Sequence, residues 1–255
     1  NLPLTQLHEK ESKLFGGSGE LEGKSKFNIS IKKTSVATKT TYKTFPEKFG
    51  DGPAWYAPNK RANIFVYLGY GMYDNKNNIW KKYIDPGSKF QVIISTFNKE
   101  IIDEIKFVFR VFATFGGLGA KSRNGYGQFN LINMPQVTLS ELKKYILVNA
   151  APNFSYFSNE GRLFTTEKKF SNWSDALFFL GNHYRLSKLQ AEGKKHVYQQ
   201  RSYISSPIQQ AKWDNVFNRK TKPYFLHINK KNGEFEAAIL YLPYYDVIKD
   251  KAIYS

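Results

Sequence analysis

GGLGAKSRNGYG, at residues 116–127, is the most informative stretch of this sequence. Five of its residues are glycine, which lets a backbone approach a ligand closely and turn several N–H groups toward it. Lys121 and Arg123 add positive charge between the glycines, and Tyr126 adds an aromatic face. The stretch therefore predicts a backbone cradle for phosphate groups, with a flexible connector as the alternative interpretation.

The loop does not match the two common nucleotide-binding motifs. Ala120 stands where a P-loop has the glycine before Lys121 and Ser122, and the predicted order is helix to strand rather than strand to helix. The dinucleotide fingerprint fails because Ser122 occupies its third glycine position. We therefore do not expect hydrolysis of ATP or GTP.

Around the loop, the pattern of apolar residues predicts a helix, three strands, a second helix, the loop and a further strand. Placing one more strand and most of a helix before residue 1 would complete βαββαβ, the ferredoxin-like unit that RNA-recognition domains share. The chain also starts without Met, so we expect residues 1–134 to form a first domain that lacks its N-terminal segment. The expected helices cover residues 2–14 and 99–114, and the expected strands cover 26–33, 62–70, 89–97 and 126–132.

A second unit of similar content follows at residues 135–255. Thr138 and Glu141 match a capping box at the start of a short helix, and apolar residues from Trp173 to Tyr184 have helical spacing. Strands are expected at 154–170, 224–229 and 235–242, with Asn232-Gly233 as a hairpin turn. The expected fold class is α+β, with two ferredoxin-like (RRM-like) domains built on antiparallel sheets.

The charge of the chain points to a polyanionic partner. Its 255 residues include 38 Lys and Arg against 21 Asp and Glu, a formal net charge of +17, while a hydrophobic content of 41% is enough for packed cores. Such an excess on a folded surface repels itself unless a polyanion neutralises it. Nucleic acid is the first candidate and an acidic membrane surface the second.

Several classes of site are excluded or not expected. The chain has no Cys, which excludes thiolate zinc sites, iron–sulfur clusters, cysteine nucleophiles and disulfides. Its start does not resemble a signal peptide, and no apolar run approaches the roughly 18 residues of a membrane span. We expect a cytoplasmic protein with no metal, no cofactor and no membrane partner.

Two further basic clusters follow the loop. Either cluster could contact a polyanion, and a solvated surface is the alternative for both. Aromatic residues in loop-rich stretches could stack on bases, although packing explains each of them as well. The first cluster contains His183, Arg185, Lys188, Lys194, Lys195, His196 and Arg201, the second contains Lys212, Arg219, Lys220 and Lys222, and the aromatics are Trp55, Tyr56, Tyr70, Tyr73 and Trp80.

The glycine-rich loop resembles the C-terminal glycine-rich loop of the RAMP superfamily of CRISPR proteins. Other pieces, in the expected order, resemble the RAMP subunit that is conventionally named first in the type III-B (Cmr) effector complex. These pieces are Glu11-Ser-Lys-Leu-Phe15-Gly16, Tyr67-Leu-Gly-Tyr70-Gly71, Asp85-Pro-Gly87, Trp173-Ser-Asp-Ala176, Ser205-Ser-Pro207-Ile208 and Tyr241-Leu-Pro243. The family's opening strand and first helix are not present in this sequence, and Asn124 replaces a loop position that is often basic.

The resemblance implies a non-catalytic RNA-binding subunit that lies near the 3′ end of the guide RNA and helps to capture target RNA in antiviral defence. Its partners would be guide (crRNA) and target RNA and the other RAMP subunits of the complex. The residues expected to bind RNA are Gly116, Gly117, Gly119, Lys121, Ser122, Arg123, Gly125, Tyr126, Gly127, Arg185, Lys188 and Arg201.

Two other hypotheses remain open from the sequence. Metal-independent ribonucleases of the superfamily use a histidine for acid–base catalysis, so His183 or His196 could process guide precursors. His227 alternates with apolar residues in an expected strand and is interpreted as structural, and His8 lies on the exposed side of a helix. The third hypothesis is a generic RNA-binding protein outside CRISPR systems.

Overall fold

The computed structural model describes residues 4–17, 19, 23–35, 38–39, 63–72, 83–146, 155–192 and 222–244. Contacts within the chain divide it into two compact units, each made of two segments. Unit 1 contains residues 1–42 and 79–109, and unit 2 contains residues 43–78 and 110–255. The domain boundary expected at residue 134 stays a prediction.

Unit 1 begins with helix α1 (Leu4–Phe15), which confirms the helix expected at 2–14. Gly16 ends it in a left-handed conformation, with φ of 82° and its N–H bonded to the Ser12 carbonyl. A side chain at this position would lie 2.7 Å from the backbone nitrogen of Ser25, so only glycine fits. The following backbone returns along the helix end, where the rings of Phe15 and Phe27 meet edge to face at 5.6 Å.

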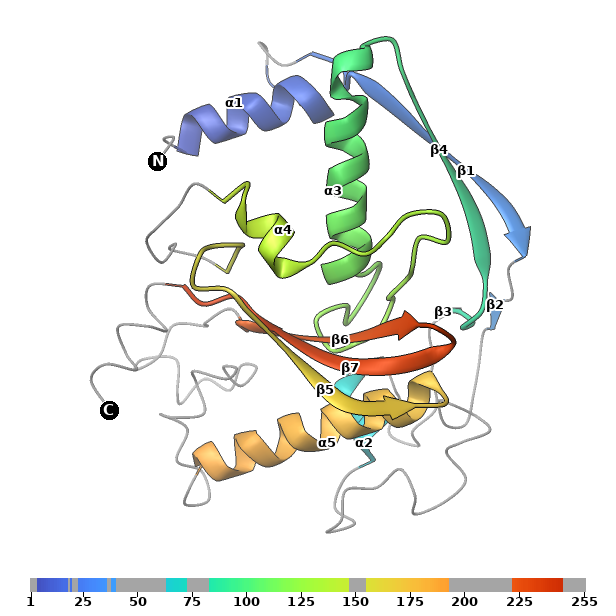
Figure 1. Ribbon diagram of the computed structural model, residues 1–255, viewed down its shortest axis with the longest axis vertical. Coiled ribbons are helices and arrows are strands. Elements are labelled where there is room, and N and C mark those ends of the chain that lie inside the picture. The colour runs from blue at the N-terminus through green and yellow to red at the C-terminus, as the bar shows by residue number, and fades with distance from the viewer. Residues whose placement is uncertain are drawn as a thin grey trace. The chain divides into compact units, whose positions relative to one another are not determined.

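The strands of unit 1 form antiparallel pairs. Strand β1 (Phe27–Ser35) pairs with β4 (Lys89–Thr96), and the short β2 (Thr38–Lys39) pairs with β3 (Tyr83–Ile84) (Figure 1). These strands confirm the alternation expected at 26–33 and 89–97. After β4, the Asn98 side chain accepts a hydrogen bond from Glu100 N at 3.0 Å and so caps the 3-10 helix η2 (Lys99–Ile101), which continues into helix α3 (Ile102–Phe115).

Unit 2 is built on a three-stranded antiparallel sheet in the order β5-β7-β6. Its strands are β5 (Arg162–Phe170), β6 (Tyr224–Lys231) and β7 (Glu234–Tyr241). The turn between β6 and β7 is the expected Asn232-Gly233, and both residues have positive φ, at 52° and 86°. This backbone twist matches that of the flanking strands, so the hairpin prediction is confirmed.

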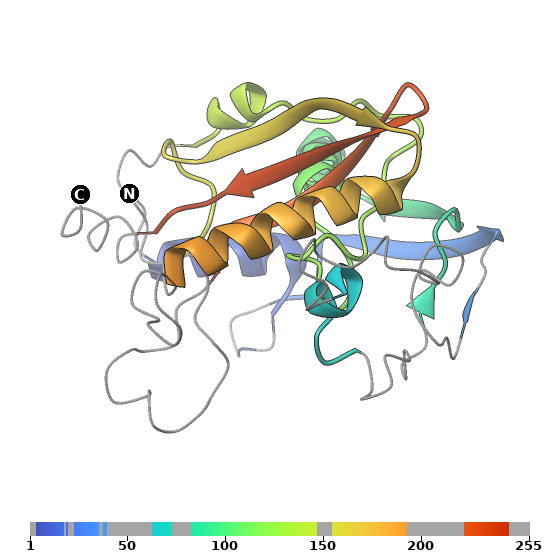
Figure 2. The same ribbon diagram turned by 90° about the horizontal axis from the view of Figure 1, so that it is seen from below.

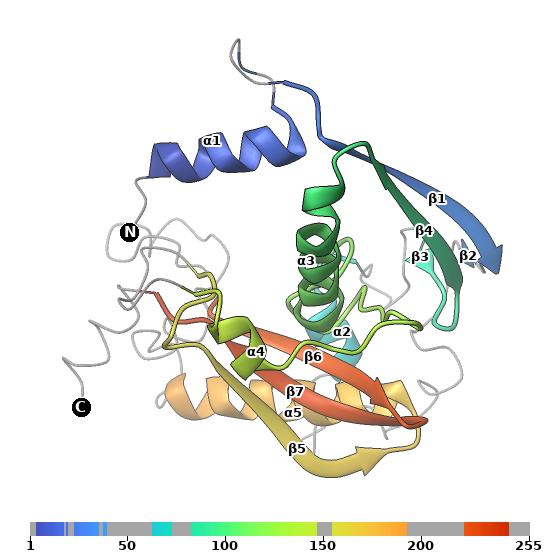
Figure 3. The same cartoon turned by 45° about the horizontal axis from the view of Figure 1, so that its top comes forward.

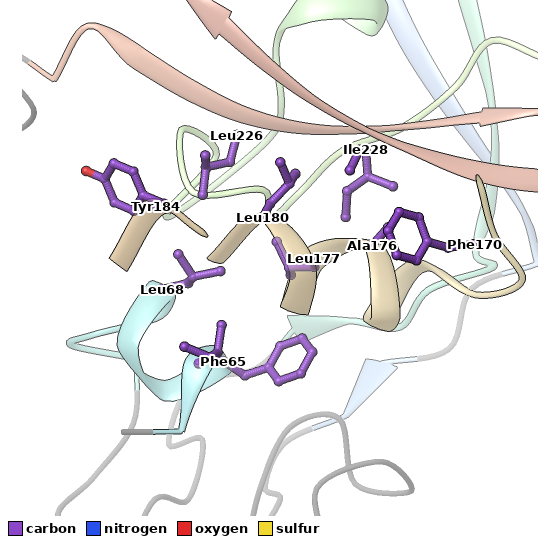
Figure 4. Packing of buried hydrophobic residues seen from close by; sticks show 11 residues of the cluster. Phe65, Leu68, Phe170, Ala176, Leu177, Leu180, Tyr184, Leu226 and Ile228 are labelled. Carbon is purple, nitrogen blue, oxygen red and sulfur yellow. The ribbon is translucent and has the colours of Figure 1, made fainter. Parts of the chain in front are cut away.

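Helix α5 (Trp173–Glu192) covers one face of this sheet (Figure 2). Its first turn is capped by Asn172, whose side-chain oxygen accepts hydrogen bonds from Asp175 N at 2.9 Å and from the Ser174 hydroxyl at 2.6 Å. Leu177 and Leu180 of α5 pack against Leu226 of β6, as Figure 4 shows. The helix expected from Trp173 is therefore confirmed.

A short helix, α2 (Ile64–Leu68), packs against α5 on the side away from the sheet. Ile64, Phe65 and Leu68 are at most 1% exposed and belong to the same core (Figure 4). Close approach of the two helices requires Gly181, because a side chain there would meet Ile64 and would lie 2.7 Å from Leu68 Cδ1.

A short helix lies on the other side of the sheet. Helix α4 (Leu139–Lys143) lies on the side away from α5 (Figures 1 and 3). Thr138 caps it, accepting a hydrogen bond from Glu141 N at 3.0 Å, as the capping-box motif predicts. The Glu141 carboxylate instead receives Arg110 of α3, with Nη1 at 3.0 Å from Oε1. The end of α3 is thus bound to α4 within unit 2.

The structure confirms a mixed α/β architecture with antiparallel sheets and corrects two expected strands. Residues 62–70 contain helix α2 rather than a strand, because the Asn63 side chain caps the N–H groups of Phe65 and Val66 at 3.0 and 3.2 Å. Residues 126–132 form no strand. There the side chain of Gln128, rather than the backbone, bonds to β6, as described below.

In the part of the chain that the structure describes, we find no helix with the length and apolar character to cross a membrane.

Candidate nucleic-acid interface

The loop at 116–127 is a compact closed structure in unit 2. Leu118 N donates to the Gly127 carbonyl at 2.8 Å and closes its base. The Lys121 carbonyl accepts from Asn124 N at 2.8 Å, which forms a tight turn at the tip. Lys121 itself has a φ of 62°, a left-handed conformation that costs a non-glycine residue about 1 kcal/mol. This ordered hydrogen bonding argues against the flexible-connector interpretation.

The loop binds the free edge of strand β6. Leu226 N donates to the Arg123 carbonyl at 3.0 Å. The Gln128 side chain then continues the pairing, since its Nε2 donates to the Leu226 carbonyl at 2.9 Å and its Oε1 accepts from Ile228 N at 2.6 Å. These bonds satisfy edge groups of β6 that would otherwise lack partners, and they hold the loop at a defined register.

Two side chains of the loop bind the helix α2. Asn124 Nδ2 donates to the Leu68 carbonyl at 2.7 Å, which satisfies an orphan carbonyl at the helix end. The Tyr126 hydroxyl donates to the Phe65 carbonyl at 2.9 Å, and its ring packs against the core. The geometry of Tyr126 therefore fits support of the loop.

The glycines of the loop differ in what surrounds them. A side chain at Gly116, Gly125 or Gly127 would collide with Phe112, with Leu177 or with the Leu118 carbonyl, respectively, so these three glycines serve packing. A Cβ atom at Gly117 would lie 3.1 Å from the Cβ of Ser122, which is closer than an ordinary van der Waals contact. Gly119 has a φ of 79° and nothing within 4 Å of its would-be side chain. It is the loop glycine with an open approach to its backbone.

Arg123 and Lys222 lie together beside the loop. The Lys222 ammonium donates to the Arg123 carbonyl at 3.1 Å and to Asn124 Oδ1 at 2.7 Å. Arg123 Nη1 in turn donates to the Lys222 carbonyl at 3.5 Å, and its guanidinium lies 4.7 Å from the centroid of the Phe225 ring. The Arg123 side chain is exposed, while Lys222 is half-buried.

Helix α5 contributes aromatic rings and further cations. The ammonium groups of Lys222 and Lys188 lie 4.1 and 5.0 Å from the centroid of the Tyr184 ring. Arg185 is only 9% exposed, and its Nη1 has no hydrogen-bond partner within the described structure. Lys188 of α5 is thus connected to the loop through Tyr184 and Lys222. The residues Arg201, Lys194, Lys195, His196, Lys212, Arg219 and Lys220 lie outside the described residues.

The surroundings of Lys222 disfavour the charged form of its side chain. Burial lowers its pKa well below the ordinary value of 10.5, and the neighbouring charges of Lys188 and Arg123 lower the pKa further. The ion pairs of the described residues join Lys106 to Asp103, Arg110 to Glu141, Arg162 to Glu160 and Lys169 to Glu236, and none includes Lys222 or Arg123. Among the described residues, Lys222 and Arg123 therefore form a positively charged pair that an anion would stabilise.

The histidines do not form an acid–base pair within the described chain. His227 is 4% exposed, and burial lowers its pKa to about 4. Its Nδ1 lies 2.8 Å from Gln128 Nε2, which agrees with the structural role expected for it. His183 Nδ1 lies 2.8 Å from the Phe179 carbonyl, and its ring lies 4.1 Å from the Phe179 ring. We also find no metal-binding group of three or more His, Asp or Glu side chains in the described ranges.

Sequence reasoning missed two parts of this site. Lys222 was recognised as basic but not as a partner of the loop, from which it is 98 residues distant along the chain. Tyr184 is predicted only as a residue with helical spacing in α5, yet it belongs to the core and its ring also lies next to the two ammonium groups. The sequence signal for this site is the mixture of basic and aromatic residues in α5 and at the start of β6. Spacing along the sequence does not show which of these residues contact each other.

Comparison with known proteins places the chain in a family. The sequence model of the RAMP superfamily matches residues 2–130, whereas no curated protein sequence matches significantly. Among solved structures, the fold is similar to the apo crystal structure of Cmr1 from Pyrococcus furiosus, with a TM-score of 0.58 and 17% identity over 95% of this chain and 73% of that chain. The family match covers half of the sequence and includes the glycine-rich loop. The chain therefore belongs to the RAMP superfamily.

Proposed function

We propose that this protein is a non-catalytic RNA-binding subunit of a type III-B CRISPR effector complex. In this role it works in the cytoplasm with the other RAMP subunits, contacts guide or target RNA near the 3′ end of the guide and helps to capture target RNA in antiviral defence. Family membership and the fold shared with Cmr1 support the proposal. The observation that carries it is the cluster of cations beside an ordered glycine-rich loop.

The loop is suited to contacts with the RNA backbone rather than with bases. Arg123 is exposed, Lys121 is half-buried at the loop tip, and Gly119 leaves its peptide groups open to approach. Cations and backbone N–H groups bind phosphate and sugar without reading the sequence, so base recognition is left to pairing between guide and target. Lys188, Arg185 and Ser122 belong to the proposed RNA surface, and Arg201 is proposed on its sequence alone.

An exposed aromatic side chain lies near this surface. Tyr70 follows Leu68, whose carbonyl binds Asn124 of the loop, and the Tyr70 side chain is 69% exposed. A ring with that exposure can stack on an unpaired base. Tyr70 is thus a better candidate for stacking than Tyr126, whose hydroxyl and ring are both occupied within the protein.

The domain architecture is part of the proposal. In unit 2, the order β5-α5-β6-β7 places β7 between β5 and β6, antiparallel to both. This is the arrangement of the first four elements of a ferredoxin-like βαββαβ unit. We propose that both domains, residues 1–134 and 135–255, are ferredoxin-like.

The experiment is fluorescence anisotropy of the purified protein with a labelled single-stranded RNA over a salt series, with the same samples run on a denaturing gel. We expect binding that weakens steeply as salt rises, because phosphate contacts release counterions, and RNA that stays intact. RNA cleaved in the presence of EDTA and spared by His183→Ala or His196→Ala would instead establish the metal-independent endoribonuclease. Absence of RNA binding, alone and with RAMP partners, would contradict the proposal.

A further inference from the structure

The ring of Tyr184 carries two ammonium groups at once. Lys222, two residues before the start of β6, contacts the Tyr184 ring. Lys188, one turn after Tyr184 in α5, contacts the same ring. Both nitrogens lie within 5.0 Å of the same ring centroid. A single aromatic face attracts a cation by only about 0.5–2 kcal/mol, which does not compensate the Lys222 ammonium for its lost hydration and for the nearby charge of Lys188.

The donors of this cluster are only partly used. Lys222 donates two hydrogen bonds, to the Arg123 carbonyl and to Asn124 Oδ1, and an ammonium group has three protons. Arg123 makes one hydrogen bond within the described chain, to the Lys222 carbonyl, and a guanidinium has five N–H donors. The remaining donors of the exposed Arg123 guanidinium are open to an anion from solvent.

Contacts within the protein hold the two side chains in place. The Lys222 ammonium is fixed by two oxygens and a ring, and the Arg123 guanidinium is fixed by a carbonyl and the Phe225 ring. Neither side chain has an ion-pair partner among the described residues. Side chains that are already ordered lose little further entropy when a ligand binds, so the arrangement is prepared for an anion.

We propose that Arg123, Lys188 and Lys222 bind one phosphate group of an RNA strand beside Tyr184, an inference that rests on the proposed function. Phosphate fits better than a carboxylate side chain because its several oxygens can accept from all three cations at once. A phosphate here also favours the charged form of Lys222, since a nearby anion raises the pKa that burial and like charges lower. The site adds Lys222 and Tyr184 to the residues that the family resemblance implies for RNA binding.

The test compares the salt dependence of RNA binding in four proteins: wild type, Lys222→Gln, Arg123→Gln and the double variant. Each single variant should reduce the slope of log K against log salt by about 0.7, the value for one phosphate of a single strand. Because both side chains bind the same phosphate, the double variant should lose about 0.7 as well, not twice that amount. Lys231→Gln is the matched control, since Lys231 is an exposed lysine at the far end of β6.

The outcomes separate this inference from the proposed function. Wild-type RNA binding with slopes in Lys222→Gln and Arg123→Gln equal to that of Lys231→Gln would overturn the phosphate site and leave the proposed function standing. A double variant that loses twice the slope would mean two separate phosphates and would also overturn it. Loss of RNA binding in the wild type would contradict the proposed function itself.

Two further measurements complete the test. Far-UV circular dichroism and thermal midpoints of each variant verify folding, and Arg123→Gln changes an exposed side chain and should keep the fold. Inorganic phosphate is the probe for a free anion as the source of the phosphate group. If inorganic phosphate raises the thermal midpoint in a Lys222-dependent way while the RNA slopes stay unchanged, the site serves a small anion and the RNA assignment is wrong.

Discussion

Acidification should destabilise the fold through His227, and the effect can be calculated from its surroundings. Gln128 Oε1 accepts from Ile228 N, which orients the Gln128 amide so that its Nε2 donates toward His227 Nδ1. The Nδ1 atom of His227 must therefore stay unprotonated and act as the acceptor. A proton on Nδ1 would place two N–H donors, from His227 and Gln128, against each other. Burial acts in the same direction and lowers the pKa to about 4 from the ordinary 6.5.

The sign follows from proton uptake. Between these two pKa values the unfolded chain binds a proton at His227 and the folded chain does not, so stability rises with pH across this window. The contribution is complete above pH 6.5 and is lost as pH falls toward 4. The linkage relation gives a loss of about 2 kcal/mol at pH 5 and about 3 kcal/mol at pH 4 relative to neutral pH.

The assay is urea unfolding at pH 7.5 and pH 5.0 for the wild type and for His227→Gln, which keeps a polar side chain but cannot be protonated. Other groups titrate alike in both proteins, so the wild type should lose about 2 kcal/mol more than the variant between the two pH values. His183→Gln, a change at an exposed ring of α5, is the matched control variant. Equal losses in the wild type and in His227→Gln would refute the reasoning.

Two further changes test the packing of the loop and of α2. Gly125→Ala should destabilise by about 2–4 kcal/mol, because the new methyl group lies 2.5 Å from Leu177 Cδ1 and φ is 88°, whereas Gly119→Ala should cost only about 1 kcal/mol for its positive φ. Similar urea midpoints for the two variants would show that Gly125 does not pack as described. Asn63→Ala should cost about 1–2 kcal/mol by removing the cap of α2, and Asn63→Ser should recover most of it, since serine also accepts from the first turn. A thermal midpoint of Asn63→Ala equal to that of the wild type would argue for the strand expected at 62–70.

Elements with a regular pattern were predictable from the sequence. The alternation in β1 and β4, the helical spacing in α5 and the Asn232-Gly233 turn all depend on local preferences that the fold does not override. The structure of the short apolar run at 62–70 was not predictable, because a buried one-turn helix and a buried strand have the same apolar sequence pattern at that length. Only the capping role of Asn63 distinguishes them.

The expected strand at 126–132 failed for a different reason. Its alternation of apolar and polar residues is real, but the edge of β6 is paired by the Gln128 side chain in place of a backbone ladder. A side-chain amide has the same donor and acceptor as a peptide group, so it can substitute for one residue of a strand. Sequence patterns carry no sign of such a substitution.

The candidate site was predictable as a loop but not as a cluster. The glycines, Lys121 and Arg123 identify residues 116–127 as a backbone-binding structure, and the structure adds that Gly116, Gly125 and Gly127 serve packing. The contact of Lys222 with Asn124 joins residues far apart in the chain. Such a contact follows from the antiparallel sheet order and from the approach of α5, neither of which spacing along the sequence determines.

The most direct test of the central claim is photo-crosslinking of the protein to a 4-thiouridine-substituted single-stranded RNA, followed by mapping of the crosslinked peptides. Peptides that contain residues 116–127, 184–188 and 222–225 should carry the crosslinks, because the loop, α5 and the start of β6 form the proposed RNA surface. Crosslinks confined to α1 or to the β1–β4 pair, with none in these three segments, would contradict it.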